Sequence, residues 1–155
     1  MSVAEYDAWY PRAVHEYVED HIKAGSMPAD KAHEMAANQF AELLPDGVET
    51  AEHHLLMGES GGERVGLLWL RIPAAATSGD VNAFVYDVEV DADKRGAGFG
   101  RGLMLAAETY AADHGASTIK LHVFGSNTVA RALYESLGYE TTNVAMARPL
   151  GPATT

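Results

Sequence analysis

The chain has 155 residues, of which 47% are hydrophobic and 8% aromatic, enough for one folded domain and too apolar for a disordered chain. The lack of cysteine excludes disulfides, thiolate metal ligands and a cysteine nucleophile, and it is typical of a cytoplasmic protein. A formal net charge of −11 disfavours nucleic acid as a partner and favours a cationic one such as an amine, although acidity can also serve solubility alone.

The first third of the chain predicts a pair of helices. Apolar residues recur at helical spacing over residues 5–24, with Gly25 as a stop, and over residues 28–44, with Pro28 in the first turn. No apolar run approaches the roughly 20 residues that span a bilayer. The first residues also lack a basic region followed by an apolar block, so we expect no secretory signal.

From residue 53 onward the pattern changes to short strands and further helices. Strands are predicted at 53–59, 64–72, 82–90, 118–124 and 139–148, and helices at 99–114 and 127–137. This order predicts an α/β fold with a mixed sheet. Within the third strand, alternation places one set of side chains (Phe84, Tyr86, Val88, Val90) on one face and the other set (Ala83, Val85, Asp87, Glu89) on the opposite face.

A glycine-rich turn follows the third strand and opens the helix at 99–114. Such a turn points several backbone N–H groups and the positive end of the helix dipole in one direction, which suits a phosphate. Glycine lets the phosphate oxygens approach the backbone, and Arg95 and Arg101 can add charge-assisted contacts. The alternative is a glycine-rich helix start that binds no ligand.

Three known phosphate-binding patterns have glycine-rich turns of this kind. A P-loop needs Lys followed by Ser or Thr after the glycines, and neither pair is present. The dinucleotide pattern begun at Gly96 and Gly98 would need glycine where Arg101 stands. The pattern Arg-x-x-Gly-x-Gly is filled by Arg95, Gly98 and Gly100.

A second motif lies in the helix predicted at 127–137. Its pattern, Asn-x-x-Ala-x-x-Leu-Tyr-x-x-x-Gly-Tyr, comprises six residues (Asn127, Ala130, Leu133, Tyr134, Gly138 and Tyr139). Asn127 and Tyr134 are seven residues apart, so they share one face of the helix about 10 Å apart along its axis. Asn127 can cap this helix or bind an amide-bearing ligand, and Tyr134 can equally be an ordinary core tyrosine.

Together the two motifs resemble the GNAT acetyltransferase superfamily, and the chain looks like an uncharacterised bacterial branch of it. The resemblance spans about residues 12–150. It implies one acyl-CoA N-acyltransferase domain over residues 1–150, with a mostly antiparallel mixed sheet flanked by helices. The polar residues 151–155 are expected to be a disordered tail. One departure from the family is that no strand is predicted before the first helix.

The resemblance also implies acetyl-CoA as co-substrate and names the residues that bind it. The strand end (Val88, Glu89, Val90) would bind the pantetheine and the thioester oxygen, and the turn (Arg95, Gly96, Ala97, Gly98, Phe99, Gly100, Arg101) would hold the diphosphate. Asn127 and Ala130 would meet the pantetheine arm, and Tyr134 would protonate the departing thiolate. Without a cysteine, direct attack by the amine in a ternary complex is favoured over an acyl-enzyme.

The proton acceptor for the amine stays open between two residues. Glu89 lies on the strand that leads to the site, on the same predicted face as Asp87, and His122 lies five residues before the motif asparagine. Each can instead be structural: a solvated carboxylate or a hydrogen-bonded interior histidine.

Other features bear on rival functions. His53 and His54 are adjacent on a strand and therefore point to opposite faces, so we expect no metal site.

A non-catalytic acyl-CoA-binding module and a nucleotide-binding domain are the alternatives to an enzyme. The acceptor is expected to be a small-molecule or peptide amine, and the acidic chain would favour a cationic one. It would be selected by the first two helices, residues 73–82 and the last strand. The chain could be a monomer or a homodimer.

Overall fold

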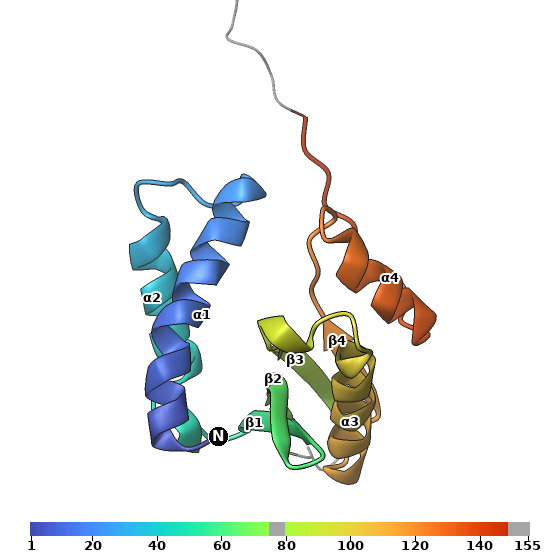
Figure 1. Ribbon diagram of the computed structural model, residues 1–155. Coiled ribbons are helices and arrows are strands. Elements are labelled where there is room, and N and C mark those ends of the chain that lie inside the picture. Colours follow the sequence, from blue (N-terminus) through green and yellow to red (C-terminus); the bar gives the residue numbers. More distant parts are fainter. Residues whose placement is uncertain (75–79, 149–155) are drawn as a thin grey trace, which may run out of the picture. The chain divides into compact units, whose positions relative to one another are not determined.

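The structure is a computed structural model that describes residues 1–74 and 80–148. The chain forms two compact units, Met1–Phe124 and a second one that begins at Gly125 (Figure 1). The predicted tail, residues 151–155, and residues 75–79 of the loop at 73–82 lie outside the described residues. The expectation of a single domain over residues 1–150 remains a prediction.

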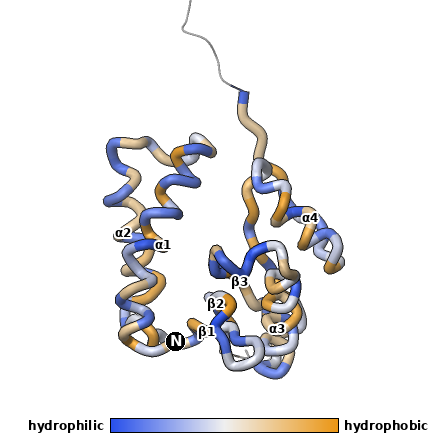
Figure 2. The backbone as a smooth tube through the Cα atoms, in the orientation of Figure 1, coloured by the Kyte–Doolittle hydropathy of each residue, from blue (hydrophilic) through white to orange (hydrophobic). Residues whose placement is uncertain are grey.

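Two amphipathic helices begin the first unit. Helix α1 (Val3–Lys23) starts with a capping box, in which Ser2 and Glu5 satisfy each other's backbone N–H groups. Helix α2 (Ala32–Leu43) begins four residues later than predicted, because Pro28 lies in a turn whose carbonyl accepts from the Lys31 amide. Hydrophilic and hydrophobic segments interleave along both helices (Figure 2).

The sheet has the strand order β1-β2-β3-β4. Strands β1 (His53–Ser60), β2 (Glu63–Arg71) and β3 (Asn82–Val90) pair antiparallel, and β4 (Thr118–Leu121) pairs parallel with β3. Two 3₁₀ turns, η1 (Gly47–Glu49) and η2 (Ala92–Lys94), precede β1 and follow β3. The α/β fold with a mostly antiparallel mixed sheet is therefore confirmed, and within the described residues no strand precedes α1.

Helices cover both faces of this sheet. On one face, α1 and α2 build a core with β1 and β2 (Trp9, Ala13, Phe40, Leu44, Leu55, Leu67 and Trp69). On the other, α3 (Phe99–Asp113) packs Ala111 against Ile72, Val81 and Ala83. Because both faces are covered, every residue of β2 from Val65 to Leu70 is buried.

A β-bulge changes the predicted alternation of β3. Asp87 pairs with Trp69 and Val85 pairs with Leu70, so Tyr86 is an extra residue between two paired ones. Tyr86 stacks on Trp69 at 4.7 Å between ring centroids, and Asp87 bonds to Trp9 of α1, whereas Ala83 packs against α3. The predicted grouping of Asp87 with Ala83 was therefore wrong, because an extra residue reverses the facing of everything after it.

The strand predicted at 139–148 was also wrong. The second unit contains α4 (Thr128–Ser136), and residues 139–148 form neither helix nor strand. Alternating β-formers give only a propensity, and a strand needs a partner to accept its hydrogen bonds.

Gly66 brings β2 and β3 close together next to Glu89. A Cβ built there would collide with the backbone oxygen of Glu89 and touch Leu103, whereas a Cβ at Gly102 meets nothing. We therefore expect Gly66→Ala to lower the free energy of unfolding by about 1–3 kcal/mol, the cost of overpacking. Gly102→Ala, in the first turn of α3, should leave it unchanged or raise it by up to about 1 kcal/mol. Urea denaturation followed by circular dichroism measures both, and equal effects would contradict the close approach.

Candidate active site

Among the described residues, the end of β3 has a partner strand on one side only. Pairing with β4 stops at Val85, whereas pairing with β2 continues to Val90. In the part of the chain that the structure describes, no strand borders the outer edge of β3 from residue 86 to 90. The backbone predicted to bind pantetheine, Val88 to Val90, lies on this stretch.

Ionic contacts with β2 anchor the start of the glycine turn. Arg64 forms an ion pair with Asp91 at 3.1 Å, and the Asp91 amide donates to the Val65 carbonyl. Lys94 donates to Glu63 at 2.9 Å. The turn therefore leaves β3 from a fixed point.

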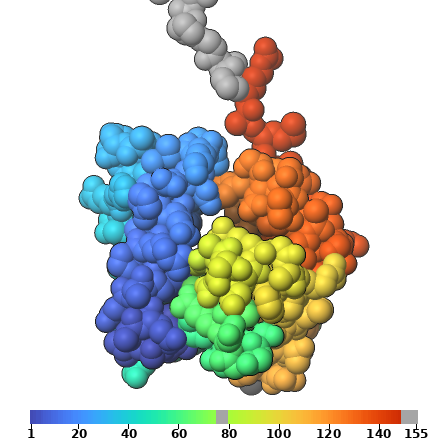
Figure 3. Space-filling model, viewed as in Figure 1, coloured from blue at the N-terminus to red at the C-terminus, as the bar shows by residue number. Residues whose placement is uncertain are grey.

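The glycines of the turn adopt the backbone that the anion-site prediction requires. Gly96 and Gly98 have φ of 76° and 86°, in the left-handed region that favours glycine, and Gly98 is the N-cap of α3. A Cβ built on either would meet nothing within 4 Å. A glycine N-cap offers no side-chain acceptor, so the first amides of α3 are not capped by it. Residues 91–98 lie at the surface (yellow in Figure 3).

The predicted arginines lie on either side of this helix start. The Arg95 Nε donates to the Val90 carbonyl at 3.0 Å, which directs its guanidinium back over the end of β3. Arg101 is exposed in the first turn of α3, which also holds Phe99 and Gly100. Ala97 lies between the two left-handed glycines. This group of residues, 95–101, is therefore brought together as predicted.

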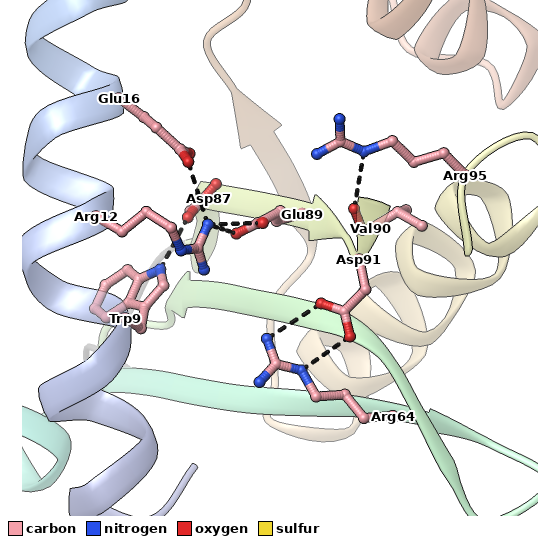
Figure 4. Close-up of polar contacts among 9 residues, drawn as sticks. All are labelled: Trp9, Arg12, Glu16, Arg64, Asp87, Glu89, Val90, Asp91 and Arg95. Carbon is pink, nitrogen blue, oxygen red and sulfur yellow. Dashed lines mark hydrogen bonds and ion pairs between the residues drawn. The ribbon is translucent and has the colours of Figure 1, made fainter. Parts of the chain in front are cut away.

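Two carboxylates of β3 face α1 beside the same strand end (Figure 4). Asp87 accepts a hydrogen bond of 3.3 Å from the Trp9 indole. Both oxygens of Glu89 lie 2.7 Å from the Arg12 Nη1, which also contacts Glu16 at 3.3 Å. The β-bulge at Tyr86 turns both carboxylates toward the helix.

The two carboxylates differ in their electrostatic surroundings. Burial, assisted by the charges of Glu89 and Glu16 and opposed by the Trp9 hydrogen bond and Arg12, raises the pKa of Asp87 to about 6. Pairing with Glu89 is also the main reason why the pKa of Arg12 is raised.

Trp9 and Arg12 are the residues that sequence reasoning missed. Trp9 was recognised only as part of an apolar stripe. The available signal was Arg12 itself, a charged residue three positions after Trp9 on the apolar side of a helix. Both residues line a cavity of about 410 Å³, which is completed by Ala4, Glu5, Ala8 and Arg64.

The second unit carries the other motif on one helix. The Asn127 side chain caps α4 by accepting from the Ala130 amide at 3.1 Å, so two predicted cofactor residues bond to each other. Tyr134 lies near the end of α4, with its ring 5.8 Å from that of Tyr139.

The three histidines that the sequence singled out, His53, His54 and His122, each contact an aromatic side chain. His122 is exposed just after β4, with its ring 5.1 Å from that of Phe124. His53 accepts from the Trp69 indole at 2.8 Å, and His54 contacts the Tyr110 hydroxyl on α3 at 3.0 Å, so the two point to opposite faces.

Residues 1–74 and 80–148 contain no group of three side chains suited to a metal ion. Of the helices described there, none is both long and apolar enough to cross a bilayer.

Comparison with known proteins gives these features a family context. Residues 11–139 match the model of the acetyltransferase (GNAT) family. This chain belongs to the GNAT family. It is 32% identical over 150 residues to YycN of Bacillus subtilis, an uncharacterised N-acetyltransferase, covering 97% of this chain and 96% of YycN. The crystal structure of YycN superposes with a TM-score of 0.89 over 97% of this chain and 95% of that one.

Two further acetyltransferases match the whole chain or part of it. YdgE of Bacillus subtilis, also an uncharacterised N-acetyltransferase, is 28% identical over 97% of this chain and 95% of its own length. The mycothiol acetyltransferase of Thermobispora bispora is 39% identical over 84 residues, which cover 54% of this chain and 28% of that protein. The expected family and the acetyltransferase class are thus confirmed.

Proposed function

We propose that this GNAT protein transfers an acetyl group from acetyl-CoA to a primary amine by direct attack in a ternary complex. The observation that carries the proposal is the glycine turn that opens α3. Gly96 and Gly98 adopt left-handed backbone, and the space where their side chains would be is open. A diphosphate fits such a helix start because bare backbone amides and the helix dipole both favour an anion.

Three segments of the chain supply the proposed contacts with acetyl-CoA. The turn from Arg95 to Arg101 binds the diphosphate, and the backbone from Val88 to Val90 binds the pantetheine and the thioester oxygen. This backbone is suited to the task because, among the described residues, no second strand pairs with β3 there. Asn127 and Ala130 serve the pantetheine arm.

Tyr134 is the proposed acid. When bound, acetyl-CoA supplies an activated acyl group whose departure requires protonation of a thiolate. The Tyr134 phenol donates that proton, and the seven-residue spacing from Asn127 places both on one face of α4.

A base must accept a proton from the amine, because amines are mostly protonated at neutral pH. Glu89 and His122 are the candidates from the sequence. The ion pair with Arg12 counts against Glu89, because both of its oxygens already bond to one guanidinium nitrogen.

We propose that the acceptor is a small-molecule or peptide amine, and that the net charge of −11 favours a cationic one. We further propose that the protein is a monomer or homodimer in the cytoplasm.

A CoA-release assay against amines, peptide N-termini and aminoglycosides tests the function. Release that depends on one acceptor is expected. Tight acetyl-CoA binding without release for any acceptor would identify a non-catalytic acyl-CoA-binding module instead.

Gly98→Ala tests the coenzyme loop, with Gly115→Ala as its matched control. Both glycines have positive φ (86° and 87°) and open space around them, and they lie at opposite ends of α3. Either change should cost about 1–2 kcal/mol of stability through backbone strain. We expect only Gly98→Ala to weaken acetyl-CoA binding by calorimetry, by roughly tenfold or more, because its methyl group occupies the proposed diphosphate position. Equal weakening by both would argue against the loop.

A further inference from the structure

The two carboxylates of β3 differ in how they are held. Both oxygens of Glu89 are within 2.7 Å of one Arg12 nitrogen, and its side chain is 18% exposed. Asp87 accepts its hydrogen bond from a neutral donor, the Trp9 indole. The oxygens of Glu89 are thus engaged by a charged partner, whereas the hydrogen bond from the indole leaves Asp87 with a neutral one.

We propose that Asp87 accepts the proton of the acceptor ammonium, and that Arg12 is a positioning residue that holds Glu89 as its counter-ion. This inference rests on the proposed acetyl transfer and adds to it a base and the residue that sets its surroundings. The bulge at Tyr86 supports it, because the extra residue turns Asp87 toward α1 rather than toward α3.

The charges around Asp87 are consistent with this role. Arg12 and Glu16 face it from α1, Glu89 follows it on β3, and its cross-strand partner on β2 is the uncharged Trp69. Burial, assisted by the two glutamates, raises the pKa of Asp87 to about 6. A base is most effective when its pKa lies near the working pH, since it is then both ionised and basic.

The acceptor also has room beside the residues that hold these carboxylates. The cavity of about 410 Å³ is lined by Trp9 and Arg12 together with two alanines, Glu5 and Arg64. An amine that entered it would therefore touch the side chains that bond to Asp87 and Glu89.

The proton and electron pairs balance in the proposed step. Asp87 takes one proton from the ammonium, and the freed nitrogen lone pair forms a C–N bond to the acetyl carbonyl carbon. The C–S bond breaks, and its electron pair leaves on sulfur, which takes a proton from the Tyr134 hydroxyl. The second nitrogen proton returns to the Tyr134 oxygen, and the Asp87 proton passes to water.

The test is the pH dependence of CoA release with whichever amine the panel identifies. For the wild-type protein, kcat/KM should fall as the pH drops below about 6, when Asp87 is protonated. Asp87→Asn should lower kcat by roughly 10²–10⁴-fold and abolish this acid limb, with the KM for acetyl-CoA within about twofold of wild type. Glu89→Gln should lower kcat by less than about tenfold and keep the fall of kcat/KM at low pH.

Arg12→Gln provides a second measurement that does not depend on the folding of Asp87→Asn. Removing the guanidinium withdraws a positive charge that favours ionised Asp87, so the acid limb should move to higher pH. The inference is overturned if the acid limb of kcat/KM does not move in Arg12→Gln, or if Asp87→Asn keeps both its kcat and its acid limb. Either result would leave the proposed acetyl transfer standing. If the wild-type protein releases no CoA with any amine, the proposed function fails and this inference fails with it.

Discussion

Asp87→Asn is expected to raise the free energy of unfolding at about pH 8 by up to about 3 kcal/mol, although the same change should lower kcat by roughly 10²–10⁴-fold. The folded protein raises the pKa of this carboxyl from 3.8 to about 6, so the folded state binds the proton more tightly than the unfolded chain. The contribution to stability is therefore present below pH 3.8 and is lost as the pH rises to about 6. Above that pH the ionised Asp87 destabilises the folded state by about 1.4 kcal/mol for each unit by which folding raises its pKa.

Urea denaturation followed by circular dichroism measures this effect. Asparagine keeps an oxygen that can accept from the Trp9 indole, so the comparison isolates the buried charge. The gap between the two proteins should narrow to about half at about pH 5, where part of the wild-type Asp87 is already protonated. A gap that does not change with pH would mean that Asp87 has no unusual proton affinity. This readout does not require an acceptor.

Tyr134→Phe should lower kcat by roughly 10²–10⁴-fold, because the thiolate would leave without its acid. The dissociation constant of acetyl-CoA should change little, since the ring remains and only the hydroxyl is lost. Steady-state kinetics and calorimetry give the two quantities separately.

Tyr139→Phe is the matched control for this change. The two rings lie 5.8 Å apart in the same unit, so a general disturbance of α4 should affect both variants. Turnover that survives in Tyr139→Phe and is lost in Tyr134→Phe supports the assignment. Equal turnover in both variants contradicts it.

The local parts of the fold and the site could be predicted from the sequence. The turn from Arg95 to Arg101 has its conformation set by Gly96 and Gly98, and the Asn127 cap acts on the amide three residues later. Both features depend on neighbours within a few residues, which a pattern can encode. The structure accordingly groups residues 88–101 as predicted, while Asn127, Ala130 and Tyr134 lie together on the second unit.

The features that were missed depend on pairings between distant segments. The bulge at Tyr86 arises from the register between β2 and β3, which alternation within β3 cannot report. Arg12 and Glu89 are separated by 77 positions, so neither residue alone predicts their ion pair. For the same reason, the sequence offers Glu89 as a candidate base and gives no sign of its counter-ion.

The central claim is that the start of α3 holds the diphosphate of acetyl-CoA, and a crystal structure of the complex tests it most directly. The account predicts diphosphate oxygens within hydrogen-bonding distance of backbone amides between residues 96 and 101, with the thioester beside the backbone from Val88 to Val90. A diphosphate bound elsewhere, with the glycine turn left empty, would contradict the account.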